Sequence, residues 1–201
     1  MSEYDHEPIP GLPGRLPEGE ELLWQGSPDW VGLAQRAFHI RGMALYFAAL
    51  MVWAVYNGTL VGIALTVAGT VLGLALIAGI AWFSARSTIY SITNRRVVLR
   101  YGVALQKCIN LPFAQIGAAG IAKDTAGRGD IPLQLTGAHR LGYLQFWPHV
   151  RPWKLAKPEP MLRSLKDADA VVELLGGLLK KQHEMPEPTV SRRAPLEALA
   201  A

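Results

Sequence analysis

The stretch that decides the fold is MALYFAALMVWAVYNGTLVGIALTVAGTVLGLALIAGIAWF, residues 43–83. It contains no charged side chain, although 18% of the whole chain is charged, and Asn57-Gly58-Thr59 is its only strongly polar interruption. A membrane helix needs about 20 apolar residues, so this stretch is too long for one span and fits two. Asn-Gly favours a turn because both residues tolerate positive φ. The sequence therefore predicts a helical hairpin, with spans over about 40–56 and 60–83.

Two alternatives compete with a membrane hairpin. A buried helical pair in a soluble protein would show a polar stripe at the helical period, and this stretch has none. A cleaved signal peptide would be shorter and nearer the N-terminus. Arg36 and Arg41 precede the hairpin, Arg86 follows it, and the connecting turn is uncharged. The positive-inside rule therefore predicts a multi-pass protein with both termini in the cytoplasm.

The rest of the chain divides around this hairpin. The predicted segments are a flexible Pro- and Gly-rich lead (1–17), a short strand (18–28), an interfacial amphipathic helix (29–41), the hairpin (42–84), a β domain with a C-terminal helix (85–182) and a disordered tail (183–201). Short β-rich segments predict a small antiparallel sandwich or barrel; they lie at 88–93, 96–101, 103–111, 116–124, 131–136 and 141–146. The C-terminal helix is expected at 167–181. Trp24, Trp30 and Phe38 are expected at the membrane interface, where aromatic side chains gather.

Composition and motifs favour a protein without catalytic chemistry. The net charge of +4 is no more than a membrane protein needs for orientation, so no nucleic-acid partner is predicted. The lone Cys108 excludes an intramolecular disulfide and a cysteine-based zinc site. No phosphate-binding loop or metalloprotease motif occurs, and no metal site or cofactor is expected. Asp124, Asp130 and His139 flank loops and form the one set that catalysis could use, but neighbouring polar loop residues are ordinary.

Small residues and one histidine in the hairpin each have two interpretations. Gly62, Gly69 and Gly73 lie on the second span, and small residues let another helix approach closely. They either pack the two spans together or receive a partner's membrane helix. His39 lies at the inner edge of the first span. It either bonds to headgroups or backbone, or ligates the magnesium of a bacteriochlorophyll.

Four arginines follow the second span at intervals: Arg86, Arg95, Arg96 and Arg100. In the first interpretation, these arginines determine the membrane topology and keep the β domain soluble. Each basic residue near an anionic leaflet also contributes about 1 kcal/mol of attraction. In this second interpretation, Arg95 and Arg96 at the tip of a β-hairpin hold one end of the barrel against anionic lipid.

Two strings of residues carry a family resemblance. Gly-Glu-x-x-Leu-Trp-x-Gly at 19–26, an apolar helix pair, and Tyr-Ser-Ile-Thr-Asn-Arg-Arg-Val-Val at 90–98 resemble bacterial membrane-anchored domains of the pleckstrin-homology (PH) type. The resemblance implies an all-β PH-like barrel that the N-terminal strand joins and a C-terminal helix closes.

The string Trp-Gln-Gly-Ser-Pro-Asp-Trp at 24–30 is similar to that of photosynthetic complex assembly proteins of purple bacteria. This resemblance implies a non-enzymatic inner-membrane factor. Its partners would be subunits of the reaction centre and of its core antenna, light-harvesting complex 1, together with anionic lipid or a second copy of the chain. The alternative is a PH-like protein that binds lipid or senses stress.

Overall fold

A computed structural model describes residues 10–137 and 142–184. The elements follow in the order β1 (Leu22–Gly26), α1 (Trp30–Arg36), α2 (Ile40–Asn57), α3 (Leu60–Ser87), β2 (Ile89–Thr93), β3 (Arg96–Tyr101), β4 (Lys107–Pro112), a 3-10 turn (Phe113–Gln115), β5 (Ile116–Ala119), β6 (Ala122–Lys123), β7 (Gly129–Leu135), α4 (Tyr143–Phe146), β8 (Met161–Leu165) and α5 (Ala168–Glu184). His139, the lead before residue 10 and the expected tail beyond residue 184 lie outside the described residues.

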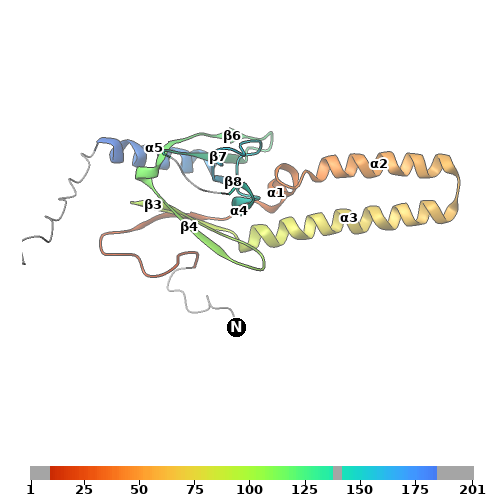
Figure 1. Ribbon diagram of the computed structural model, residues 1–201, viewed down its shortest axis with the longest axis horizontal. Coiled ribbons are helices and arrows are strands. Elements are labelled where there is room, and N and C mark those ends of the chain that lie inside the picture. Colours follow the sequence, from red (N-terminus) through yellow and green to blue (C-terminus); the bar gives the residue numbers. More distant parts are fainter. Residues whose placement is uncertain (1–9, 138–141, 185–201) are drawn as a thin grey trace, which may run out of the picture.

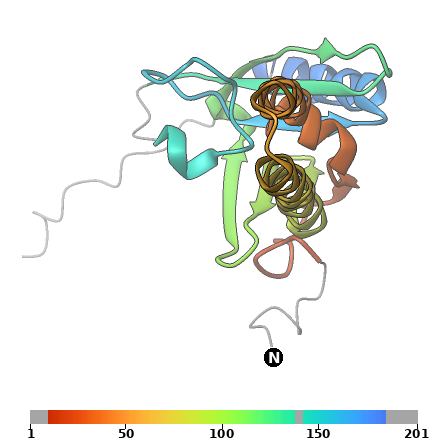
Figure 2. The same ribbon diagram turned by 90° about the vertical axis from the view of Figure 1, so that its right-hand side faces the viewer.

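Two antiparallel sheets and one helix form the β domain (Figure 2). The first sheet has the order β1-β2-β3-β4, and in the second β5 and β6 both pair with β7, which also pairs with β8. Alternate residues of β2 and β3, such as Ile92 and Leu99, point into the core, as the two-residue period of a strand requires. Val171, Leu175 and Leu179 of α5 complete that core. The fold is therefore an apolar helical hairpin followed by an all-β PH-like domain with a C-terminal helix.

The hairpin is inserted between the first two strands of the first sheet. The chain leaves β1, passes through α1, α2 and α3, and returns as β2, which pairs with β1 from Leu22↔Thr93 to Gly26↔Tyr90. The N-terminal strand is thus part of the β domain. Both ends of the hairpin emerge from the same end of that domain (Figure 1), which we call the hairpin end.

The two hairpin helices are long, apolar and uncovered. Only 6% of the most apolar window of α2 and 0% of that of α3 is buried, which argues against a core pair of a soluble protein. The 28 residues of α3 span about 42 Å, more than the ~30 Å of a bilayer core. Its last turns, with Ala81, Ser84 and Ala85, are buried against the β domain. These observations support membrane association.

The helix expected over 29–41 is present but shorter, and it packs on protein. The helix α1 ends at Arg36, and Ile40 starts α2 after His39, whose positive φ of 51° interrupts the helix. Leu33 and Ala34 are buried inside the protein and do not face lipid. The apolar period alone cannot distinguish a helix that packs on protein from one that packs on lipid.

Other boundaries also differ from the sequence predictions. Tyr143–Phe146 is helical where a strand was expected, and β8 was not predicted. The expected strand over 116–124 is split into β5 and β6, and 103–106 forms a turn before β4. The N-terminal segment 1–17 was predicted to be flexible, but its described part, from residue 10, is packed on the protein. Leu12 is 1% exposed, and Gln25 Nε2 donates to Pro10 O at 2.7 Å. Residues 183 and 184, placed in the tail, end α5.

Candidate functional site at the hairpin end

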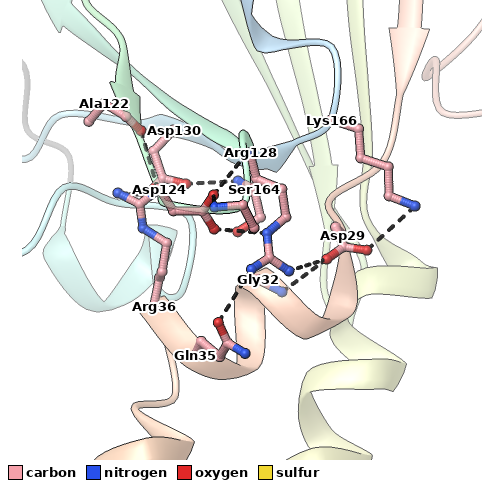
Figure 3. Close-up of polar contacts among 11 residues, drawn as sticks. Asp29, Gly32, Gln35, Arg36, Ala122, Asp124, Arg128, Asp130, Ser164 and Lys166 are labelled. Atoms are coloured by element: carbon pink, nitrogen blue, oxygen red, sulfur yellow. Dashed lines mark hydrogen bonds and ion pairs between the residues drawn. The ribbon is translucent and has the colours of Figure 1, made fainter.

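An ion-pair cluster fixes α1 to the β domain. Asp29 caps α1, since its Oδ2 accepts from Gly32 N at 3.1 Å. Arg128 donates from Nη1 to Asp29 Oδ2 and from Nε to Asp124 Oδ2, both at 2.8 Å (Figure 3). Burial is the largest influence and raises the pKa of both carboxyls, but the hydrogen bonds that they accept and the neighbouring positive charges together outweigh it and hold each pKa below its usual value. We call Asp29, Asp124 and Arg128 the Arg128 clamp.

A second set of contacts joins the end of α1 to β7 and β8. Arg36 Nη2 lies 3.2 Å from Asp130 Oδ2, and Asp130 Oδ1 accepts from Ser164 N at 2.8 Å. Gly32 allows this close approach, because a Cβ there would lie 2.8 Å from Ser164 Oγ. Asp124 and Asp130, the two described members of the set considered for catalysis, are thus engaged in ion pairs that position α1.

These contacts couple the hairpin to the β domain. The helix α1 lies against the last turns of α3 on one side and contacts β8 on the other. A rigid connection of this kind holds the β domain at a fixed orientation to the hairpin. The arrangement is suited to positioning a bound partner. The two clamp carboxylates are both paired with Arg128, so neither is free to act as a nucleophile or base.

An aromatic groove lies beside this connection. Trp24, Trp30 and Trp82 line a cleft of about 550 Å³ together with Arg86 and Lys166. Trp24 Nε1 donates to Asp167 Oδ2 at 2.7 Å, and the Arg86 guanidinium lies 4.9 Å from the centre of the Trp82 ring. The structure therefore brings together two of the predicted interface residues, Trp24 and Trp30, and one of the predicted orienting arginines, Arg86. Phe38 lies apart from them, with its ring 5.2 Å from that of Trp147.

The predicted orienting arginines do not form one surface. Arg95 and Arg96 lie at the β2–β3 turn, at the end of the sheet away from α3 (Figure 1). The intervening strand spans on the order of 15 Å and separates these two side chains from the end of α3. Arg96 pairs with Glu20 at 2.8 Å, and Arg100 donates to Gln106 at 2.9 Å. Arg86 alone of the four adjoins the hairpin.

The glycines of α3 face different surroundings. A Cβ on Gly73 would lie 2.9 Å from Phe47 Cζ of α2, so Gly73 packs the two spans together. Gly62 adjoins Thr59 Oγ1 at the start of its own helix, and only open space surrounds Gly69. Gly69 and Gly73 are therefore not one groove for a partner. His39 is exposed at the start of α2 and makes no side-chain capping bond.

The comparisons with known proteins identify the family. The family model for the bacterial PH domain matches residues 37–179. The chain belongs to the bacterial PH domain family. A protein of Rhodobacter capsulatus, named as an uncharacterized 23.7 kDa protein in the puhA 5′ region, is 38% identical over 204 residues, which cover 96% of this chain and 94% of that protein.

A solved structure shows a weaker likeness. It is a DUF1696 family protein with a pleckstrin-homology domain from Shewanella loihica PV-4, 12% identical, covering 46% of this chain and 71% of its own. The TM-score is 0.31. The bacterial PH domain assignment rests on the family model and on the R. capsulatus relative.

Sequence reasoning missed one feature of this PH-like domain, the loop between β3 and β4. Val103 and Leu105 are 55% and 81% exposed on this loop. Val103 lines a cavity of about 170 Å³ with Ile80 of α3 and with Phe38. Because Ile80 belongs to the apolar part of α3, the loop lies beside the apolar surface of the hairpin. The signal in the sequence is an apolar turn, Val103-Ala104-Leu105, where polar residues are usual.

We therefore expect the β3–β4 loop to contact lipid while the β2–β3 turn stays in water. A nitrobenzoxadiazole probe at Leu105→Cys, in a Cys108→Ser background, should emit at shorter wavelength in liposomes and be quenched by spin-labelled lipid. The same probe at Arg95→Cys is the control, and it should show aqueous emission without lipid quenching. Equal emission and quenching at the two positions would contradict this placement of the domain.

Proposed function

We propose that this chain is a non-enzymatic assembly factor for the photosynthetic reaction centre and its core antenna, of the kind represented by PuhB in purple bacteria. The observation that carries the proposal is the 38% identity, over nearly the whole chain, to the R. capsulatus protein of the puhA 5′ region. The Trp-Gln-Gly-Ser-Pro-Asp-Trp string at 24–30 adds to the resemblance. The flanking Arg36, Arg41 and Arg86 favour an inner-membrane protein with both termini in the cytoplasm.

The proposed mechanism is binding of a client in two places. The open face of α3 around Gly69 receives a client's membrane helix, and the β domain docks a soluble part of the same client. Because the clamp fixes the two surfaces relative to each other, the second contact forms at high effective concentration. In residues 10–137 and 142–184, no three His, Cys, Asp or Glu side chains gather as a metal site.

The test is client recovery by Gly69→Leu protein. Tagged variants are purified in mild detergent from cells grown photosynthetically, and co-purifying polypeptides are counted by mass spectrometry. We expect recovery of reaction-centre and antenna subunits to fall roughly fivefold, which corresponds to about 1 kcal/mol of lost helix packing. Gly79→Leu is the matched control, because open space surrounds Gly79 too.

Recovery that is equal for wild type, Gly69→Leu and Gly79→Leu would remove the α3 face from the mechanism. Gly73→Leu serves a different purpose, since it collides with Phe47 and should separate the spans. Absorbance of bacteriochlorophyll in the purified fraction, lost in His39→Ala, would support the pigment-ligand interpretation of His39.

A lipid-binding PH-like protein is the second candidate. The observation in its favour is the aromatic groove, whose Trp82 and Arg86 lie on the last turns of α3 beside the cationic Lys166. The same purification distinguishes the two, because recovery of the protein with anionic lipid and no photosynthetic polypeptide would favour this candidate.

A further inference from the structure

A second cavity, of about 380 Å³, lies between the end of α1 and the second sheet. Its walls include Arg36, Arg151 and Arg163, and Asp130 is the one acidic side chain among the described residues that line it. It is separate from the aromatic groove and shares no lining residue with it. Three guanidinium groups around one carboxylate make its wall strongly positive.

Arg163 is the unusual member of this wall. Its side chain stands on β8 and the residue is 5% exposed. Nη2 donates to Val150 O at 3.0 Å, whereas Nε and Nη1 have no hydrogen-bond partner among the described residues. A guanidinium group stays protonated in proteins, so it cannot relieve the cost of burial by losing its charge. A buried charge of this kind needs a counter-charge.

The nearby carboxylates are already engaged. Asp130 bonds Arg36 and the backbone N–H of Ser164. Glu159 receives both Arg151, at 3.0 Å, and Lys154. The four cationic side chains Arg36, Arg151, Lys154 and Arg163 therefore share the two carboxylates of Asp130 and Glu159, which leaves a net charge of +2 in this part of the protein.

We propose that this cavity binds a phosphate-bearing anion, with Arg163 as its buried counter-charge and Arg151 at its wall. A net charge of +2 matches the charge of a phosphate group, and the partly exposed Arg151 can offer phosphate oxygens its planar fork of donors. Protein atoms cover Nε and Nη1 of Arg163. An anion in the cavity still stabilises that charge, because Coulomb interactions are weakly screened in a protein interior.

The phosphate can come from a lipid headgroup or from solution. The wall residue Arg36 ends α1 just before α2 begins, so the cavity lies near the hairpin end, where headgroups are concentrated. A free phosphate reaches the same site through water. The chemistry is shared, and the experiment below separates the two sources.

The test is thermal unfolding of the full chain in phosphatidylcholine nanodiscs, with sodium phosphate compared with sodium chloride at equal ionic strength. We expect phosphate at tenfold its Kd to raise the Tm of the wild type by about 4 °C. Arg151→Gln should abolish the increase. Arg95→Gln, which removes an arginine at the far end of the first sheet, should keep it.

The second arm replaces part of the phosphatidylcholine with phosphatidylglycerol. An increase in Tm that appears only with phosphatidylglycerol, and is lost in Arg151→Gln, assigns the site to a lipid headgroup. An increase with dissolved phosphate in pure phosphatidylcholine assigns it to a free anion. If Arg151→Gln responds like the wild type in both arms, the proposal is wrong.

Thermal unfolding of the Arg163→Met variant is an independent test of the proposal. A buried arginine without a ligand is a net cost, so its removal would raise Tm and leave any phosphate effect intact. Under the proposal, Arg163→Met loses the phosphate or phosphatidylglycerol effect. A variant that folds and still responds like the wild type overturns the role of Arg163.

Discussion

Replacing Arg128 with Met is expected to lower the free energy of unfolding of the β domain by about 3 kcal/mol. Breaking a buried ion pair by removing one partner costs about 3–5 kcal/mol, and the lower end applies because the side chains of Asp29 and Asp124 are 13% and 15% exposed. The variant leaves two carboxylates close together without their shared cation. The measurement is urea unfolding in mild detergent, followed by near-ultraviolet circular dichroism.

Two further variants show whether the clamp causes the loss. Arg95→Met is the matched control, since Arg95 is exposed and makes one long bond to a backbone carbonyl, and it should change stability by less than about 0.5 kcal/mol. Adding Asp124→Asn to Arg128→Met should restore part of the loss, because one unpaired carboxylate is then neutral. Equal stability of Arg128→Met and Arg95→Met would show that the clamp contributes nothing.

The Arg128 clamp also connects stability to the proposed function. With α1 released, the β domain keeps only its contacts with the last turns of α3, and its orientation to the hairpin is less fixed. Hydrogen exchange at the amides of α1 should then rise well before global unfolding. Client recovery should fall together with this local loosening if the two binding surfaces must be held in register.

The hairpin and the first sheet were predictable because their signals are local. Residues 43–83 lack charge entirely, and the turn between the two spans is marked by Asn57-Gly58. The alternating strands around Asn94-Arg95 give β2 and β3. These patterns depend on neighbours in the sequence, so the sequence alone contains them.

The candidate site was less predictable because it depends on distant contacts. Arg95 follows the second span closely in sequence, but the intervening strand leads away from the hairpin, so closeness in sequence did not mean closeness in space. Arg128 and Asp29 are separated by 99 positions, and no pattern pairs them. In β8, the sequence Met-Leu-Arg-Ser-Leu contains two polar residues, a pattern typical of partial exposure. All five residues are nevertheless buried.

Acidification from pH 6.5 to 4.5 is expected to lower the free energy of unfolding by about 2 kcal/mol, because of one buried histidine. His149 is fully buried, and burial together with the charge of Arg163 lowers its pKa from 6.5 to about 3. Tyr90 Oη lies 2.7 Å from Nδ1, and Thr88 Oγ1 lies 3.1 Å from Nε2.

The neighbouring bonds identify the proton on this ring. Tyr90 Oη accepts from Arg163 N, so it donates its own proton to His149 Nδ1. Thr88 Oγ1 donates to Ser84 O at the end of α3, so it accepts from Nε2–H. The neutral Nε2–H form therefore satisfies every bond. A second proton on Nδ1 would meet the Tyr90 hydroxyl as donor against donor.

The sign of the pH effect follows from the lowered pKa. Between pH 3 and 6.5 the unfolded chain binds a proton at His149 that the folded protein does not, so stability falls as pH falls. The slope approaches about 1.4 kcal/mol per pH unit once the pH is roughly a unit below 6.5. The carboxyls of Asp29, Asp124 and Glu159 have lowered pKa values. Their contribution is lost progressively as the pH falls below about 5.

Denaturant unfolding at half-unit steps between pH 7 and 4.5 measures this slope. His149→Gln keeps a polar side chain in the network and should flatten the slope, even though it lowers stability at pH 7. His183→Gln is the control, because His183 is exposed near the end of α5 and should leave the slope unchanged. A slope in His149→Gln equal to that of the wild type would assign the acid sensitivity to other groups. A flattened slope would assign the acid sensitivity to His149, whose neutral ring joins Thr88, directly after α3, to Tyr90 of β2.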